Sequence, residues 1–193
     1  MARSGKELAT GQGGRRHEAE NESQFAITNM MNRSLTMSEH MTPEEVVRAW
    51  SEAYVSKDLD ATAAFMSDDF IRLGDSTHWT PITKQDWKEI MVNFFAAFPD
   101  WRWDMTSLMA SGDRVVCEFT ETGTFTEPYK ILPGLVLPPT GESFTDYDCD
   151  SFEVKNGLIT VIRAYVTNEI DRKFNFVAKI EEFFAAGSEP ESH

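Results

Sequence analysis

The chain of 193 residues has few basic groups and no long apolar run. It carries 18 Lys and Arg against 32 Asp and Glu, which is a formal net charge of −14. Nucleic acids and anionic membranes attract cationic proteins, so this charge argues against both as partners. A membrane-spanning helix needs about 20 consecutive apolar residues, and the sequence contains no such run. We therefore expect a globular protein that binds neither nucleic acid nor membrane.

Cysteine is also scarce, because the chain has only Cys117 and Cys149. Two cysteines cannot build a disulfide scaffold, and both fall in stretches with strand character. We expect buried free thiols, with a single bridge as the alternative. The N-terminus has no continuous apolar segment of the kind found in signal peptides. These features predict an intracellular, cytoplasmic protein.

Motifs for several common chemistries are missing. The sequence has no paired-histidine metal motif, no glycine-rich phosphate loop and no nucleophile elbow. The acidic segment 146–152 also differs from a calcium loop. Ser151 stands where such a loop needs glycine, and Gly157 stands where it needs the closing glutamate. We expect neither a metal nor a cofactor in the functional site, with a loose metal site on these carboxylates as the alternative.

Composition and periodicity divide the chain. Residues 1–40 are rich in Gly, Ser, Asn and Glu without a helical or strand period, which predicts a flexible N-terminal arm. The pattern of a folded domain covers residues 41–187, and a polar tail follows at 188–193. Apolar residues at helical spacing predict three helices early in this domain, over 43–57, 59–66 and 84–98.

After these helices the apolar period switches to alternation, which predicts an antiparallel meander. A short strand is predicted at Phe70–Leu73 and long strands at Trp101–Met109, Arg114–Phe125, Phe144–Val154 and Leu158–Asn168. The loop 126–143 is long for a compact domain, as lids and pocket rims often are. Val177–Ala186 is predicted to form a C-terminal helix. Helices followed by a meander define an α+β domain.

This order of elements resembles the SnoaL-like polyketide (ester) cyclase family of the NTF2-like superfamily. The resemblance spans about residues 44–171 and depends on Lys57-Asp58-Leu59-Asp60, Phe98-Pro99-Asp100, Gly112-Asp113-Arg114-Val115, Gly123-Thr124-Phe125-Thr126, Pro139-Thr140-Gly141 and the Asn156-Gly157 turn. It implies an NTF2-like cone, in which three N-terminal helices pack in a strongly curved antiparallel sheet around an apolar pocket. It also implies a homodimer through the outer face of the sheet.

The family's cyclases close a ring by an intramolecular aldol reaction, with an aspartate as acid and base. Counting from Gly157, the resemblance places that aspartate at Ala164, which cannot carry a proton. It places Asp150 where cyclases often have a histidine and where similar ketosteroid isomerases have the aspartic acid of their oxyanion hole. The isomerase base would fall near Gly74 and its tyrosine near Trp50, so neither residue type matches.

The segment 146–152 carries the strongest chemical signal of its own. Side chains alternate along a strand, so Asp146, Asp148 and Asp150 share one face. Like charges about 7 Å apart repel, and an apolar cavity strengthens the repulsion, so at least one carboxyl should keep its proton to unusually high pH. We predict Asp150 and Asp148 as catalytic residues. In the alternative, Asp146 and Asp148 lie solvated at an open rim.

Six residues are predicted to bind substrate: Trp50, Tyr54, His78, Trp79, Phe95 and Asn168. Trp50 and Tyr54 lie on the first predicted helix, where Trp50 would shape the cavity. The Tyr54 hydroxyl and the Asn168 amide would orient polar groups of the substrate. His78 lies in a turn-rich segment and is a candidate base, with a surface or capping role as the alternative.

The sequence thus predicts a cofactor-independent SnoaL-like enzyme of the cyclase, isomerase or dehydratase type. Its substrate would be a small hydrophobic carbonyl compound or a polycyclic compound, because buried carboxyls can move protons next to a carbonyl. The alternative is a non-catalytic NTF2-like module for small-molecule binding or assembly, to which Ala164 points.

Overall fold

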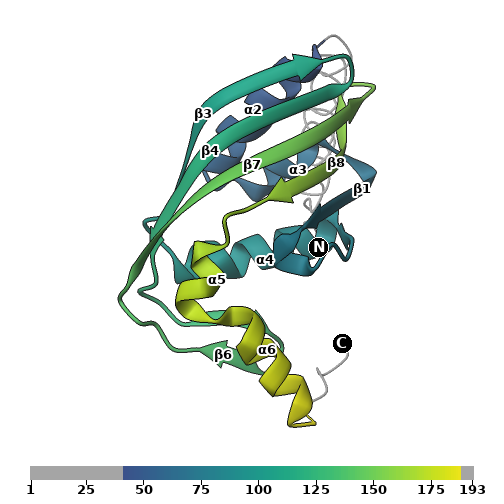
Figure 1. The fold of residues 1–193 in the computed structure, drawn as a ribbon. Coiled ribbons are helices and arrows are strands. Elements are labelled where there is room, and N and C mark those ends of the chain that lie inside the picture. Colours follow the sequence, from purple (N-terminus) through teal and green to yellow (C-terminus); the bar gives the residue numbers. More distant parts are fainter. Residues whose placement is uncertain (1–40, 188–193) are drawn as a thin grey trace, which may run out of the picture. The chain divides into compact units, whose positions relative to one another are not determined.

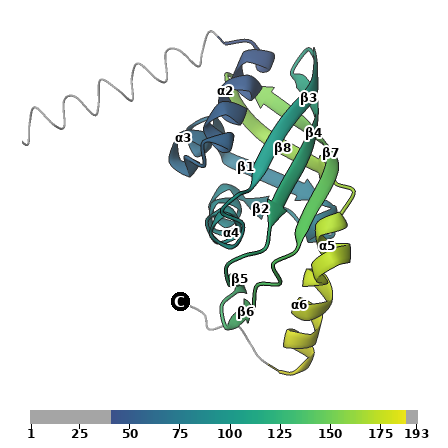
Figure 2. The same cartoon turned by 90° about the vertical axis from the view of Figure 1, so that its left-hand side faces the viewer.

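The computed structural model describes residues 41–187, so the predicted arm and polar tail lie outside the described residues. A curved sheet with strand order β2-β1-β8-β7-β4-β3 forms its centre (Figure 1). Its strands are β1 (Met66–Gly74), β2 (Ile82–Thr83), β3 (Arg102–Ser111), β4 (Arg114–Thr124), β7 (Ser143–Lys155) and β8 (Leu158–Tyr165). Three helices cover one face of the sheet (Figure 2): α2 (Pro43–Val55), α3 (Leu59–Ala64) and α4 (Lys84–Ala97).

Local sequence signals determine where the first and third of these helices begin. Thr42 accepts a hydrogen bond from the Glu45 amide, while the Glu45 carboxylate accepts one from the Thr42 amide. Thr83 and Asp86 form the same reciprocal cap at the start of α4. Each cap satisfies amides that have no partner inside the helix, so both starts could be predicted from the sequence.

Strand β7 positions the acidic segment. Its buried and exposed residues alternate, and Asp146, Asp148 and Asp150 all lie on the buried face. Antiparallel pairing places Glu121 of β4 opposite Asp146 and Ala164 of β8 opposite Asp150. The concave face of the sheet therefore carries several carboxyl groups in adjacent rows.

The edge of the sheet differs from the predicted all-antiparallel arrangement. β1 is longer than predicted and pairs in parallel with β8. Asp68 and Asp69, which fall between the predicted helix 59–66 and the predicted strand Phe70–Leu73, lie exposed within β1. They fall where the register with β8 shifts, between Met66 and Ile71, so their charges remain in solvent while the strand continues.

The C-terminal third contains structure that the sequence pattern did not predict. The loop 126–143 includes a small hairpin of β5 (Tyr129–Leu132) and β6 (Leu135–Leu137). The last long strand ends at Tyr165, and α5 (Glu169–Phe174) then precedes α6 (Phe176–Ala185), which corresponds to the predicted C-terminal helix. Asn168 and Asn175 take left-handed conformations that turn the chain before each helix.

Two further findings bear on the expectations from composition. Within residues 41–187, no helix is long and apolar enough to cross a membrane. Cys117 and Cys149 are free thiols, as predicted, and Cys117 is buried while Cys149 is only partly so.

Candidate functional site

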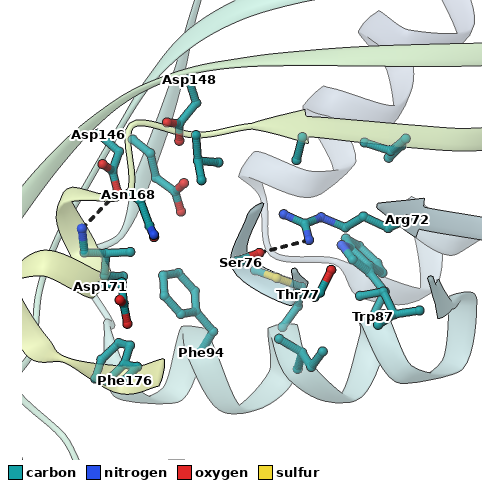
Figure 3. Close-up of a pocket in the computed structure, with 18 of the residues that line it drawn as sticks. Arg72, Ser76, Thr77, Trp87, Phe94, Asp146, Asp148, Asn168, Asp171 and Phe176 are labelled. Carbon is teal, nitrogen blue, oxygen red and sulfur yellow. Dashed lines mark hydrogen bonds between the residues drawn. The ribbon is translucent and has the colours of Figure 1, made fainter. Parts of the chain in front are cut away.

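A cavity of about 340 Å³ lies on the concave face of the sheet, and residues of α4, β5, α5 and α6 complete its lining. Most of its wall is aromatic or aliphatic, with side chains from many elements: Trp50, Tyr54, Trp87, Met91, Phe94, Trp103, Phe119, Tyr129, Ile162 and Phe176. Figure 3 shows Phe94 and Phe176 on one side and acidic residues of β7 on the other. The volume suits a small organic molecule of a few fused rings.

Asp150 is the buried carboxyl at the middle of this wall. Only 7% of the residue is exposed, and within the described chain its Oδ1 atom has no hydrogen-bond partner. Burial raises the pKa of Asp150 to about 7, although the positive charge of Arg72 lowers it and the charge of Asp148 raises it further. The carboxyl can therefore take up or release a proton near neutral pH.

Asp148 lies beside Asp150 on the same face. The Thr167 amide donates to Asp148 Oδ1 at 2.9 Å, while Oδ2 has no partner among the described residues. Burial raises the pKa of Asp148 to about 6, against the lowering effect of the Thr167 amide. The structure thus brings both predicted catalytic residues to the cavity.

Glu121 is a third carboxyl of the site, and the sequence analysis missed it. It lines the cavity from β4 and accepts a hydrogen bond from the Trp101 indole. Burial raises the pKa of Glu121 to about 8, and the charge of Asp148 adds to this effect. A signal existed, because Glu121 continues the alternation of Cys117 and Phe119 along the inward face of β4.

Asp146 is equally buried but has a different environment. The Thr167 hydroxyl and the Glu169 amide donate to its Oδ1 at 2.8 and 2.6 Å, and the Ile170 amide donates to its Oδ2 at 3.2 Å. The alternative of a solvated rim is wrong for Asp146 and Asp148, which are 2% and 5% exposed. The physical reason is α5, whose first amides cover Asp146 and need its oxygens as acceptors.

Trp50 and Tyr54 form the aromatic wall that the sequence predicted on the first helix. Their rings stack at 4.9 Å between centroids. The Tyr54 hydroxyl donates to the Met91 sulfur at 3.7 Å, and burial raises the pKa of this phenol well above its usual value. The buried Trp50 Nε1 has no acceptor among the described residues, and Trp50 is one of the residues that line the cavity.

Of the four remaining residues that were predicted to bind substrate, one lines the cavity and three do not. Asn168 lines the cavity, as predicted, whereas the lining does not include His78, Trp79 or Phe95. His78 is exposed in a turn, and the Trp79 indole donates to an exposed aspartate and contacts the exposed Tyr165. Phe95 packs instead against Trp101, at 4.8 Å between ring centroids. Their positions in a turn or on a helix were known from the sequence, but these positions did not show whether the side chains would line the cavity.

Arg72 is the second functional candidate that the sequence analysis missed. Within residues 41–187, it is the only basic side chain that lines the cavity. Its Nη1 donates to the Ser76 hydroxyl at 3.2 Å, a hydrogen bond drawn in Figure 3. The alternation of Phe70, Arg72 and Gly74 could have indicated this orientation, but only once the full length of β1 was known.

The position expected for the family aspartate lies beside Asp150. Ala164 lines the cavity and pairs in register with Asp150 on one side and Gly74 on the other. A Cβ atom at Gly74 would lie 2.8 Å from the Ala164 oxygen, so the two strands pack closely here. No group of three or more His, Cys, Asp or Glu in the described part of the chain is arranged to hold a metal ion.

A family model described as SnoaL-like polyketide cyclase matches residues 44–168, so this chain belongs to that family. Solved structures share its fold. AclR, a proposed hydroxylase from Streptomyces galilaeus, is 18% identical, with 69% of this chain and 95% of AclR covered and a TM-score of 0.58. IdmH, a proposed polyketide cyclase from Streptomyces antibioticus, is 20% identical, with 73% and 99% covered and a TM-score of 0.58.

TerC, crystallised with polyporic acid, is 16% identical to this chain, with 69% of this chain and 98% of TerC covered and a TM-score of 0.54. A search of curated proteins found no match. At these identities the solved structures establish the NTF2-like fold, while the reaction has to be argued from the residues of the cavity.

Proposed function

We propose that this protein is a cofactor-independent enzyme that catalyses proton transfer next to the carbonyl group of a small hydrophobic or polycyclic compound. One observation carries the proposal: Asp150 is a buried carboxyl with an unpartnered oxygen on the wall of an apolar cavity. Leaving a polar atom unpaired in a protein interior costs about 1–3 kcal/mol, so such an atom calls for a functional explanation.

In this proposal Asp150 acts as the acid and base. Its carboxylate takes a proton from the carbon beside the carbonyl, the C–H electron pair forms the C=C bond of an enolate, and the carbonyl oxygen gains the negative charge. The Trp50 Nε1–H donor on the same wall stabilises that oxygen. The proton then returns from Asp150 to another carbon or oxygen, as cyclisation, isomerisation and dehydration each require.

The neighbouring carboxyls tune this chemistry. The pKa values of Asp148, Asp150 and Glu121, at about 6, 7 and 8, bracket neutral pH. Protonated and ionised carboxyls therefore coexist in one cavity, and the cluster as a whole binds and releases protons. Asp148 acts as the modulator of Asp150, and Glu121 holds a proton that the cluster can share.

The proposal can be tested before the natural substrate is known. The protein should accelerate the exchange of hydrogen for deuterium beside the carbonyl of 2-tetralone in D2O, because this exchange needs only proton removal and return. Asp150→Asn should reduce the acceleration by about 100-fold or more. NMR of the ketone measures the exchange, and Asp104→Asn, an exposed change on β3, is the matched control.

A second function has one observation in its favour, the alanine at position 164. If 2-tetralone binds but wild type does not accelerate exchange, the cavity is a binding module and the acid–base proposal is wrong. The proposal is equally wrong if Asp150→Asn exchanges the ketone as fast as wild type does.

A further inference from the structure

We infer that the ligand of this cavity carries an anionic oxygen, as an enolate, phenolate or carboxylate does, and that Arg72 binds this oxygen on the side that faces Asp150. The inference rests on the proposed function, since it concerns the polar end of the same cavity. It names a specificity-determining residue and the charge of the ligand.

Arg72 has an unused capacity for binding. Its side chain reaches into the cavity from β1, and within the described chain its side-chain hydrogen bond goes to the neutral Ser76 hydroxyl (Figure 3). None of the ion pairs among residues 41–187 includes Arg72. A guanidinium has five N–H donors in a planar fork, and this geometry matches two oxygens of one anionic group.

Asp150 and Arg72 leave room for such a group between them. Asp150 of β7 pairs across the sheet with Ala164 of β8, which in turn pairs with Gly74 of β1, and these three residues form one row. Arg72 and Ile162 pair with each other in the next row on the same face. Gly74 and Ala164 have almost no side chain, so nothing large stands on the sheet beside Arg72 in that row. The two charges influence each other, yet they form no ion pair.

Three of the other carboxyls that line the cavity already accept hydrogen bonds elsewhere, whereas Asp148 keeps an oxygen without a partner among the described residues and, like Asp150, is influenced by the charge of Arg72 without forming an ion pair with it. Asp146 accepts three hydrogen bonds at the start of α5, and Asp171 accepts one from the Val177 amide at 2.8 Å. Glu121 accepts one from the Trp101 indole. Asp150 in its neutral form is itself a hydrogen-bond donor, so an anionic oxygen bound between the two side chains would meet a cation and a carboxylic acid.

Binding of two isosteric compounds tests this inference. 2-Naphthoate and 2-naphthamide have the same ring system and differ at one atom and in charge. By calorimetry at pH 7, wild type should bind the carboxylate at least about tenfold more tightly than the amide. Arg72→Gln should remove this preference by weakening carboxylate binding alone.

Two further variants separate charge from structure. Arg72→Lys keeps the cation and should keep part of the preference, while Arg102→Gln removes an exposed arginine on β3 and should keep all of it. Circular dichroism establishes that each variant is folded.

The inference is overturned if wild type binds both compounds equally, if it fails to bind the carboxylate, or if Arg72→Gln keeps the preference. That last result would make Arg72 a distant counter-ion of Asp150. None of these outcomes affects the deuterium-exchange test, in which the ketone is neutral, so failure of one proposal is distinguishable from failure of the other.

Discussion

Two regions of strand β7 carry the same residue type on the same buried face, yet they have different roles. At the end that adjoins α5, the oxygens of Asp146 accept hydrogen bonds from one hydroxyl and two backbone amides. At the middle of the strand, Asp150 presents an unpartnered oxygen to the cavity. Both residues are more than nine-tenths buried, so burial does not distinguish them.

The difference lies in the supply of donors. The first amides of a helix have no partner inside that helix, and a carboxylate placed there satisfies them. Asp146 therefore holds the start of α5 against β7 and so stabilises the C-terminal helices that line the cavity. Asp150 has no such donors, which is why we propose it, and not Asp146, as the residue that transfers the proton. In this fold, an acidic residue is a better candidate for catalysis when its oxygens have no protein partner.

The largest expected difference between Asp146 and Asp150 is in how their substitution changes the free energy of unfolding. Asp146→Asn places an NH2 group against amides that need an acceptor, so it should lower the free energy of unfolding by about 2–3 kcal/mol. Asp150→Asn should not lower it and should raise it at pH 7, because no protein donor loses its acceptor and a buried ionisable group is removed. Urea unfolding of both variants at pH 7 measures the difference. Equal losses would contradict the division of roles.

The second largest expected effect is a change in the free energy of unfolding with pH. Burial raises the pKa of Asp148 to about 6 and that of Asp150 to about 7, whereas unfolded aspartates titrate near 4. The folded state therefore binds more protons than the unfolded state from about pH 4 to pH 7, so stability should fall as the pH rises through this range.

Urea unfolding of the Asp150→Asn and Asp146→Asn variants at several pH values tests which carboxyl causes this decline. Asp150→Asn should flatten the decline in the urea midpoint between pH 5 and pH 8, because it removes one of the groups responsible. Asp146→Asn should lower the midpoint at every pH, because the amides of α5 lose their acceptor. A wild-type midpoint that rises with pH over this range would show that the carboxyls of the cavity titrate normally.

A smaller effect is expected at Thr167. Its hydroxyl donates to Asp146 at 2.8 Å and accepts from the Tyr147 amide at 3.1 Å. Thr167→Val should lower the free energy of unfolding by about 1 kcal/mol, since it removes these two bonds from a partly exposed position. Its deuterium exchange with 2-tetralone should match that of wild type. A large loss of exchange would mean that the two regions of β7 depend on each other.

Much of the fold could be predicted because its signals are local. The capping boxes at Thr42 and Thr83 mark two helix starts, and alternation along β7 places three aspartates on one face. The α+β fold and the SnoaL-like family were predicted correctly. The expected homodimer and cytoplasmic location stay predictions.

The missed residues share a physical cause. Glu121 could have been found from the alternation along β4, but its position opposite the acidic segment follows only from the register of β4 with β7. Arg72 became a candidate only when the full length of β1 and its pairing with β8 were known. Each lies in a different strand from the acidic segment, and strand pairing brings together residues that are far apart in the sequence. His78, Trp79 and Phe95 were placed at the cavity because they are aromatic or titratable, but their side chains point elsewhere.

The sequence by itself determined which side chains of β7 share a face, because the two-residue period of a strand is a local property. Only the tertiary structure decided which carboxyl is satisfied and which is open. That outcome depends on where the amides of α5 lie, and on Arg72 reaching the cavity from β1, the strand that pairs in parallel with β8. Long-range packing sets these positions, and no local pattern records them.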